Sequence, residues 1–361
     1  MVTIKAKALE ELVRDVFVKA GCSEAEGARI GKYLVSANLT GHDSHGVQRV
    51  PRYLQWMAEG EFVADRTVKV LSETPVLAVV DGQYGFGQTV APQAVAIGIA
   101  KCQSMGLAAV ALRNAGHIGR VGDWAEMAAA AGLISIHYVN AASSVLVAPY
   151  GGVDRRFSTA PYCVGVPRTG QTPLVLDFAT SIVAEGKVLN ASFGGKKIPA
   201  DALIAPDGKT SGDPHVLYGD YTPTGPRTSR TGKGAIRAFG EHKGSGLALM
   251  CEILGGSLTG SGAAQEGRRW ANGMLSIYLD PARIDPEGFF PEDVRRYVDY
   301  VKSARPATPG GEVLVPGEPE ERMRAERLKN GVPLPDDTWA AIMEAARKVG
   351  LDEGRLKRAV D

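Results

Sequence analysis

The chain has 361 residues, of which 44% are hydrophobic and 22% are charged, and this length is enough for two or three packed domains. Its 41 Lys and Arg residues are balanced by 40 Asp and Glu residues, so no net field attracts nucleic acid or an anionic membrane. We therefore expect the partners to be small molecules and other copies of the chain.

Export and membrane insertion are not predicted. Charges interrupt the apolar residues of positions 1–21, which excludes a signal peptide, and the least charged stretch, 133–152, contains polar residues and Pro149, which exclude a membrane span. A cytoplasmic protein is expected. The four cysteines have no CxxC spacing, so neither a disulfide frame nor a zinc site is indicated. We expect small buried residues at these positions: Cys22, Cys102, Cys163 and Cys251.

The first two thirds of the chain alternate between helical and strand patterns. Apolar residues at helical spacing from Leu9 to Phe17 predict a helix, and Ser23 and Glu26 are spaced as a capping box for a second one. In chain order there follow a strand pair within 68–80, a helix over 88–105, a strand over 107–112, a helix over 120–131 and a strand over 133–139. This alternation predicts crossovers in an α/β sheet. Two further apolar runs between 161 and 178 favour a hairpin, so the sheet should be mixed.

The remaining third begins with a change of composition. Residues 207–240 are rich in Gly, Pro, Thr, Asp and Arg, which predicts a long exposed loop. A helix over 243–258, a strand over 273–279 and a helix over 291–303 follow. We expect a helical N-terminal segment, 1–66, to pack with a helical C-terminal segment, 291–361, and 67–290 to form the mixed-sheet region that binds cofactor and substrate.

Two common nucleotide-binding motifs are missing. The spacing GxGxxG of a Rossmann dinucleotide fold occurs nowhere, and its nearest imitation, Gly85-Phe86-Gly87, favours a plain turn before a helix. A P-loop is also absent, because Gln171 stands where its lysine should be. Neither a Rossmann fold nor ATP chemistry is predicted.

The block from Gly41 to Arg49 holds two of the six histidines. If a helix has begun by Ser44, His45 and Arg49 lie one turn apart on one face, where a proton donor and a carboxylate clamp suit a 2-oxo acid. An equally weighted alternative is that Asp43 or Ser44 caps the helix and Arg49 forms a surface pair. A hydrolytic Ser44/His45 pair is weaker, since adjacent helical residues diverge by about 100°.

Three further segments carry polar residues at the ends of predicted elements. The glycines of 114–120 free backbone N–H groups for a phosphate at a helix N-terminus, with Arg120 as an added charge, although a plain turn is a serious alternative. The segment 176–181 ends a strand just before 183–187, and 241–246 opens a helix. Each alone is weak evidence for a site.

Together and in this order, the blocks HDSHGV..R, GHIG, DFATS....GK and HKGSGL, with Pro316-Gly317-Glu318, resemble the malate/L-lactate dehydrogenase type 2 family. That family also includes ureidoglycolate and sulfolactate dehydrogenases, diketogulonate reductase and the piperideine/pyrroline-2-carboxylate reductases. The resemblance runs nearly end to end. It implies a non-Rossmann NAD(P)-binding mixed sheet with helices, and a homodimer with its active site near the subunit interface.

The resemblance also implies roles for individual residues. His45, in its protonated form, would donate the proton with Ser44 beside it in the relay, Arg49 would hold the substrate carboxylate, and His117 would be an acid, a base or a cofactor contact. Further substrate contacts would be Thr159, Glu185, Gly186 and Lys187. Contacts to NAD or NADP would be His117, Ile118, Gly119, Arg120, Val121, Asn140, Asp177, Phe178, Ala179, Lys243, Pro316, Gly317 and Glu318.

Departures from the family pattern leave the substrate open. Ser158-Thr159-Ala160-Pro161 replaces the common Gly-Thr-Asn-Pro, and Glu185 stands where relatives often carry a basic or aromatic residue. The predicted reaction is hydride transfer between NAD(P)H and C2 of a small 2-oxo acid, with reduction of a cyclic imine or of diketogulonate as the alternative within the family. A Ser/His hydrolase and a binding protein that has kept the pocket are the alternatives outside it.

Overall fold

The N-terminal helices form where the apolar pattern predicts them. Helix α1 (Ala6–Lys19) buries its apolar stripe, and helix α2 (Glu24–Leu39) begins at Ser23, whose hydroxyl accepts the backbone N–H of Glu26 at 3.2 Å. Only this half of the predicted capping box exists. The buried Glu26 carboxylate instead accepts hydrogen bonds from Asp65 N at 2.5 Å and from the Thr89 hydroxyl at 2.8 Å, which ties α2 to two distant segments.

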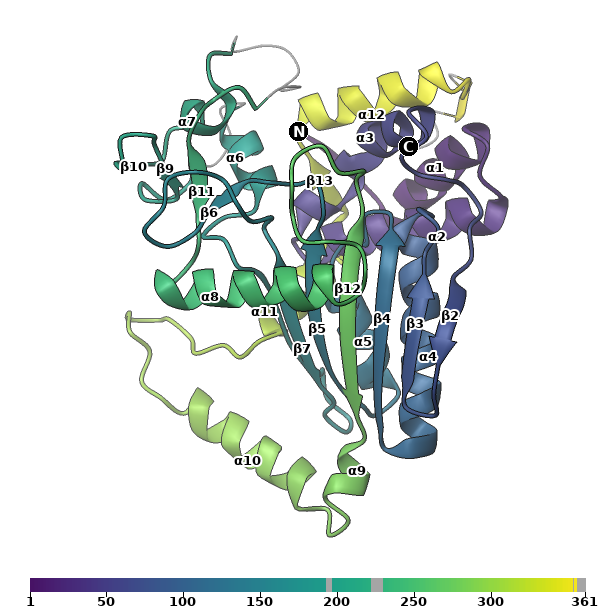
Figure 1. Ribbon diagram of the computed structural model, residues 1–361, viewed down its shortest axis with the longest axis vertical. Helices are drawn as coiled ribbons and strands as arrows, with labels where there is room; N and C mark the ends of the chain where they lie inside the picture. Colours follow the sequence, from purple (N-terminus) through teal and green to yellow (C-terminus); the bar gives the residue numbers. More distant parts are fainter. Residues whose placement is uncertain (193–196, 222–229, 353, 356–361) are drawn as a thin grey trace. The chain divides into compact units, whose positions relative to one another are not determined.

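The computed structural model describes residues 1–192, 197–221, 230–352 and 354–355. The chain forms two units (Figure 1). Unit 1 comprises residues 1–137, 163–177 and 276–361, and unit 2 comprises residues 138–162 and 178–275.

A seven-stranded mixed sheet is the main β structure. Its strand order is β2-β3-β4-β12-β5-β7-β8, with β2 antiparallel to β3 and β3 parallel to β4. The unit boundaries fall within four of these strands. The mixed α/β class predicted from the sequence is confirmed. The strands are β2 (Lys69–Glu73), β3 (Leu77–Asp81), β4 (Leu107–Ala115), β5 (Ile134–Ala141), β7 (Pro161–Val166), β8 (Leu174–Ala179) and β12 (Asn272–Leu279).

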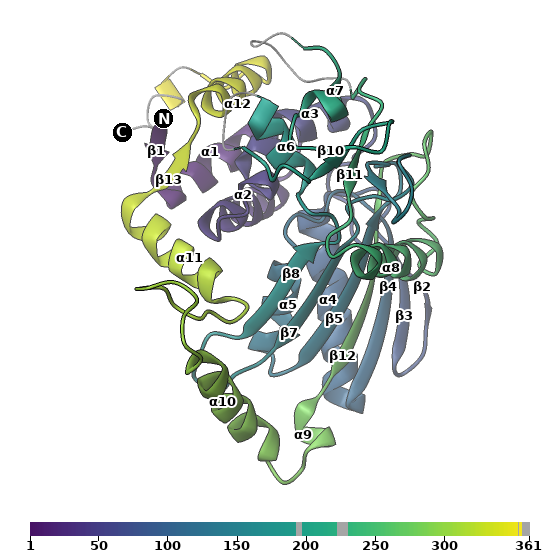
Figure 2. The ribbon, with the colours of Figure 1, turned by 90° about the vertical axis from the view of Figure 1, so that its left-hand side faces the viewer.

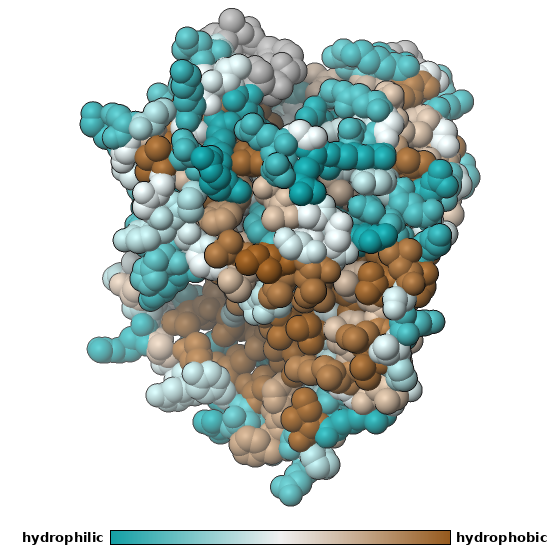
Figure 3. Space-filling view, in the orientation of Figure 1, coloured by the Kyte–Doolittle hydropathy of each residue, from teal (hydrophilic) through white to brown (hydrophobic). Residues whose placement is uncertain are grey.

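The two faces of the sheet differ in unit 1. Helices α4 (Gly87–Met105) and α5 (Gly122–Ala130) contact each other and lie behind the strands in Figure 2. Because side chains alternate along a strand, the residues of β4 that are buried against α4 leave Leu107 on the opposite face, where it is 47% exposed. Leu77 of β3 is 50% exposed there. Figure 3 shows apolar side chains gathered over these strands.

The C-terminal segment returns to the N-terminal helices within unit 1. Strand β1 (Val2–Ile4) pairs antiparallel with β13 (Val332–Leu334). Helix α11 (Glu318–Asn330) contacts α2, and α12 (Asp336–Lys348) contacts α3 (Val50–Ala58). Between β12 and α11 lie α9 (Pro281–Ile284) and α10 (Phe289–Lys302).

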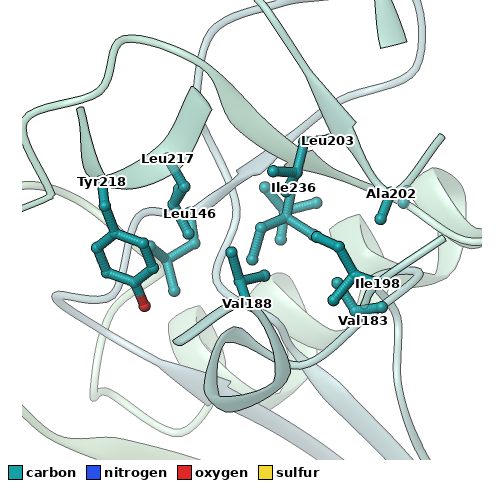
Figure 4. Close-up of a cluster of buried hydrophobic side chains, with 11 residues drawn as sticks. Leu146, Val183, Val188, Ile198, Ala202, Leu203, Leu217, Tyr218 and Ile236 are labelled. Atoms are coloured by element: carbon teal, nitrogen blue, oxygen red, sulfur yellow. The ribbon is translucent and has the colours of Figure 1, made fainter. Parts of the chain in front are cut away.

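Unit 2 has its own small sheet and core. The sheet order is β10-β9-β11-β6, and Figure 4 shows the buried cluster that includes Val188, Leu203, Leu217 and Ile236. Helix α8 (His242–Cys251) continues into a π-helical turn over Glu252–Ser257. The other elements are β6 (Val147–Ala148), α6 (Glu185–Ser192), β9 (Leu203–Ile204), β10 (Thr210–Ser211), α7 (His215–Tyr218) and β11 (Ala235–Arg237).

The segment 207–240 differs from the unbroken exposed loop expected from its composition. It contains β10, α7 and β11, and Leu217, Tyr218 and Ile236 are buried in the core of unit 2. The few apolar residues are too widely spaced to give a local pattern, and they become core only through distant partners. Residues 222–229 lie outside the described part of the chain.

The four cysteines are buried and free, as the sequence predicts. Among the described residues, no helix has the length and apolar character needed to cross a membrane. Within the same residues, no cluster of His, Cys, Asp and Glu side chains is arranged to hold a metal ion.

His137 on β5 makes stability depend on pH. Its Nδ1 lies 2.8 Å from the Ser276 hydroxyl and its Nε2 lies 3.0 Å from the Ser135 hydroxyl, and burial lowers its pKa to about 3. The unfolded chain takes up this proton near pH 6.5, so the stabilisation is complete above about pH 6.5 and declines, by at most about 1.4 kcal/mol per unit, as the pH falls towards 3.

We therefore expect His137→Gln, which keeps two hydrogen-bonding groups but does not titrate, to lose less thermal stability between neutral and mildly acidic pH than the wild type. Melting temperatures measured by calorimetry across this range test the expectation. His215→Gln, at an exposed position on α7, is the matched control. Parallel pH profiles for His137→Gln and the wild type would contradict it.

Candidate active site

Residues 42–49 are held in place by two helices of unit 1. The Asn38 side chain accepts the backbone N–H of Val47 at 2.8 Å and donates to the Asp43 carboxylate at 2.6 Å. Arg327 of α11 pairs with the same carboxylate at 2.6 Å. A Cβ on Gly46 would lie 2.2 Å from the Asn38 oxygen, so this position requires glycine.

The local backbone differs from the helix expected to begin by Ser44. Two 3-10 turns, Asp43–His45 and Val47–Arg49, are separated by the extended Gly46, and α3 begins only at Val50. Asp43 pairs with Arg327, and Arg49 donates from Nε to the Ser44 carbonyl oxygen at 2.6 Å. The structure therefore does not contain the alternative arrangement, in which Asp43 or Ser44 caps the helix and Arg49 forms a surface ion pair.

His45 and His117, 72 positions apart in the sequence, meet in unit 1. His45 Nδ1 lies 3.3 Å from His117 Nε2, and the two rings are stacked with 5.2 Å between centroids. His117 lies in the turn between β4 and α5. The first two predicted blocks thus form one histidine pair, with Ser44 next to it in the chain and Arg49 close enough to act on both rings electrostatically.

The other side of His117 is contacted by two residues that the sequence analysis missed. The Tyr53 hydroxyl lies 2.5 Å from His117 Nδ1, and Gln88 Nε2 lies 3.1 Å from that hydroxyl and 3.2 Å from the His117 carbonyl oxygen. Tyr53 could have been suspected, because it continues the four-residue spacing of His45 and Arg49. No local pattern marks Gln88.

Gly87 explains why Gln88 reaches the site. A Cβ at Gly87 would lie 2.2 Å from the His117 carbonyl oxygen, so only glycine lets the first turn of α4 approach the His117 backbone this closely. Gly85-Phe86-Gly87 is a turn before a helix, as the sequence predicts. The close approach of α4 to the His117 backbone explains why the second glycine of this turn is needed.

Both histidines of the pair are held neutral. Burial, assisted by the Arg49 charge and more weakly by His42 and Arg120, lowers the pKa of His45 to about 3. Burial, Arg49 and His45 lower the pKa of His117 well below its usual value. The protonated His45 expected from the sequence is thus disfavoured, because the surroundings of the pair are already cationic.

Arg120 is buried among carboxylates at the start of α5. It pairs with Asp123 at 3.1 Å and Glu126 at 2.7 Å, and burial is the main reason that the pKa of Asp123 is raised to about 6. The Asp177 carboxylate accepts the backbone N–H of Gly122 at 2.7 Å. A cofactor phosphate at this helix terminus, as predicted from the glycines of 114–120, would compete with Asp177.

The predicted cofactor segment 316–318 packs beside strand β8. The Pro316 carbonyl accepts the backbone N–H of Val175 at 3.3 Å, and Gly317 has φ +97° with only 2.9 Å between a built Cβ and the Pro173 carbonyl oxygen. Glu318 accepts a hydrogen bond from Lys302. These contacts hold Gly317 at the edge of a cavity.

The cavity has a volume of about 500 Å³ and lies wholly within unit 1. It is bounded by α5, the turn between β7 and β8, and α11, with Glu126, Arg168 and Arg324 among its charged residues. Its wall residue Glu320 lies 3.4 Å from His42 Nε2, so the cavity adjoins the segment that carries His45.

The remaining predicted residues belong to unit 2. The buried Asn140 donates to Glu252 at 3.0 Å and to the Gly262 carbonyl at 2.8 Å. Glu185 accepts from the Tyr218 hydroxyl at 3.1 Å and pairs with Arg230 at 2.7 Å. The Thr159 carbonyl accepts the backbone N–H of Thr180 at 3.0 Å. Of the others, Gly186 is buried, Phe178 and Ala179 are half-buried, and Lys187 and Lys243 are exposed.

Comparisons with known proteins agree with this architecture. The sequence model of the malate/L-lactate dehydrogenase family matches residues 4–343. The chain belongs to this family. Hydroxycarboxylate dehydrogenase B of Escherichia coli strain K12 is 38% identical over 98% of the chain and 96% of that protein.

Two solved structures support the same assignment. Sulfolactate dehydrogenase from Methanocaldococcus jannaschii superposes with a TM-score of 0.84 at 30% identity, covering 100% of both chains. A Δ1-piperideine-2-carboxylate reductase from Pseudomonas syringae gives 0.79 at 28% identity over 96% of this chain and 100% of that one. The chain is therefore an oxidoreductase that acts on hydroxy or oxo acids, as the sequence predicts.

Arg49→Lys tests the carboxylate clamp. Lysine keeps the charge but loses both the Nε bond to Ser44 and the planar fork, and a charged hydrogen bond contributes about 1.5–3 kcal/mol. We expect kcat/KM for a carboxylate substrate to fall by roughly 10- to 100-fold, mainly through KM. Steady-state kinetics beside Arg52→Lys, an exposed arginine on α3, provide the comparison. An unaltered kcat/KM would remove Arg49 from the substrate site.

Proposed function

We propose that this enzyme transfers a hydride between NAD or NADP and C2 of a small 2-oxo acid or 2-hydroxy acid. The observation that carries the proposal is the neutral histidine pair beside Arg49. It combines a hydrogen-bond donor for the oxygen on C2 with a cation for the adjacent carboxylate.

Arg49 holds the substrate by its terminal nitrogens. Its Nε is bonded to the Ser44 carbonyl oxygen at 2.6 Å, which fixes the plane of the guanidinium group and directs the two terminal nitrogens to a carboxylate in a bidentate geometry. The reacting carbon, one bond away from that carboxylate, is then placed near the His45 ring.

His45 acts from Nε2, because its Nδ1 faces His117. A neutral imidazole can polarise a carbonyl and supply its proton. When bound, the nicotinamide supplies the hydride that forms the new C–H bond. The N–H bond of His45 breaks as the substrate O–H bond forms, and the Arg49 charge and the His117 ring stabilise the His45 nitrogen until water returns a proton. In the direction of oxidation, water first takes the Nε2 proton of His45, and the substrate O–H bond then breaks as the His45 N–H bond forms again.

The residues present fit a dinucleotide. The cavity beside Gly317 has a volume in the range of small-molecule sites, its arginines suit phosphates, and its carboxylates suit ribose hydroxyls. We assign to it the part of the cofactor remote from the nicotinamide, with the backbone of 118–121 along the path. Because both acidic and basic side chains line the cavity, the binding of both NAD and NADP should be measured.

Ala130→Trp should therefore weaken cofactor binding. Ala130 is exposed in the cavity wall, and an indole there would occupy space that the cofactor needs. We expect the dissociation constant of NADH or NADPH, measured by fluorescence titration, to rise at least tenfold, which is about 1.4 kcal/mol. Ala131→Trp, at the next position and outside the cavity wall, is the control. Equal affinities for the two variants would exclude the cavity from the cofactor site.

The activity itself is tested by following the consumption of NADH and NADPH with a panel of substrates. The panel contains pyruvate, oxaloacetate, sulfopyruvate, 2,3-diketogulonate and pyrroline-2-carboxylate. Turnover of one or more of the oxo acids supports the proposal. Turnover of the imine alone would show that the substrate class is cyclic imines and not oxo acids. Ester hydrolysis without cofactor, together with no oxidation of either cofactor, would contradict the proposed function.

We also propose that the enzyme is a homodimer that buries the apolar sheet face. Leu77 and Leu107 are about half exposed on adjacent parallel strands, and contiguous exposed apolar surface of this kind marks an interface. Exposed Phe289, Tyr297 and Tyr300 on α10 give the same chain a second apolar surface. A second copy is the occupant that explains both surfaces.

Leu77→Lys combined with Leu107→Lys should disrupt this dimer, because burying two charges without partners is costly. We expect light scattering after size exclusion to show a dimer for the wild type and a monomer for the double variant. Leu328→Lys, at an exposed position on α11, is the control. A monomeric wild type, or a double variant that remains dimeric, would contradict the assignment.

A further inference from the structure

Tyr53 is fixed in position by a cluster of aromatic rings in unit 1. It is fully buried, and its ring packs against Phe17, Trp56, Phe62 and Phe86 with centroid distances of 5.6–6.4 Å. A ring held on several sides cannot move its hydroxyl away from His117 without disturbing the core.

The direction of the hydrogen bonds around this hydroxyl follows from Gln88. Its Nε2 lies 3.2 Å from the His117 carbonyl oxygen, which can only accept, so the amide nitrogen of Gln88 must face that side. The same nitrogen then donates to the Tyr53 oxygen at 3.1 Å. The single proton of the Tyr53 hydroxyl is left for His117 Nδ1 at 2.5 Å, since its other acceptor, the His117 carbonyl, is 3.5 Å away.

The donor of each hydrogen bond along both imidazole rings follows from this first one. A neutral His117 that accepts at Nδ1 carries its proton on Nε2. That proton faces His45 Nδ1 at 3.3 Å, so His45 accepts at Nδ1 and carries its own proton on Nε2. The chain of donors therefore ends in an N–H group at the position where the proposed function needs one.

We propose that Tyr53, oriented by Gln88, is a positioning residue that sets the tautomer of His117 and thereby keeps the proton of His45 on Nε2. The inference rests on the proposed function, in which His45 Nε2 serves the substrate. Burial raises the pKa of Tyr53, so its hydroxyl keeps its proton and acts as a permanent donor. No proton leaves Tyr53 in the reaction.

The groups that face the pair give the sign of the pH effect. Arg49, His42 and Arg120 act on His45, Arg49 and His45 act on His117, and Tyr53 donates to His117. A donor to the bare nitrogen stabilises the neutral ring. Removing the Tyr53 hydroxyl should therefore raise the pKa of the pair towards the ordinary histidine value of about 6.5 and release the tautomer.

The test combines nitrogen-15 NMR of the histidine rings with the pH dependence of kcat. In the wild type we expect His117 and His45, assigned with His117→Gln and His45→Gln, to carry protons on Nε2 and none on Nδ1. Tyr53→Phe should give a mixture of tautomers, a new titration in kcat below about pH 6.5 and about a tenfold lower kcat for reduction, with little change in KM. Gln88→Met, which removes the orienting donor, should change the spectra in the same direction.

Tyr33→Phe is the matched control, since its hydroxyl contacts Met127 at 3.8 Å and not the histidine pair. A wild-type spectrum with the His117 proton on Nδ1 overturns the inference whether or not any variant folds. Folded Tyr53→Phe with unchanged tautomers and an unchanged pH profile also overturns it. Because the spectra need no substrate, their outcome is independent of the substrate panel that tests the proposed function.

Discussion

The stacked, neutral pair of His45 and His117 is the arrangement on which the rest of this site depends. The half-buried His45 and the buried His117 remain uncharged, because protonation of either ring would place another positive charge beside Arg49 in a desolvated space. A neutral ring must carry its proton on one nitrogen only, so its tautomer becomes a structural property. The surrounding residues can then determine which atom faces the substrate.

Two glycines near the histidine pair allow neighbouring backbone segments to approach each other closely. Gly46 lets the 42–49 segment lie against Asn38, and Gly87 lets α4 lie against the His117 backbone. At Gly46 the Asn38 side chain occupies the space that a Cβ would fill, and at Gly87 the backbone of His117 and Ile118 occupies it. The ion pair of Asp43 with Arg327 then connects the 42–49 segment to helix α11, which also contributes residues to the cavity proposed for the cofactor.

Much of this was predictable because the information is local. The alternation of helices and strands follows from apolar periodicity, and the blocks around His45 and His117 follow from the density of polar residues at element ends. The 3-10 turns were not predictable, since Gly46 adopts its conformation in response to Asn38. Gln88 was missed for a similar reason: its partner His117 is 29 residues away, and a glutamine at the start of a helix carries no chemical signature.

The electrostatics of Arg120 mark another limit of local inference. A glycine-rich turn followed by an arginine predicts an anion site, yet the anions in this structure are the chain's own carboxylates, from Asp123, Glu126 and, at 4.0 Å, Asp177.

The contact of Arg49 with a carboxylate would be common to every substrate in the panel. In the proposed function, Arg49 would therefore select the class of substrate and leave the choice of member to other residues.

The most direct test of the whole account is the rate of hydride transfer in His45→Ala under single-turnover conditions with saturating cofactor. Loss of a positioned proton donor commonly costs 10²–10⁴-fold, so we expect a decrease of this size with NADH or NADPH affinity unchanged. A variant that retains most of the wild-type rate would contradict the account, and the proton would then have to come from another group, with His117 the first to examine.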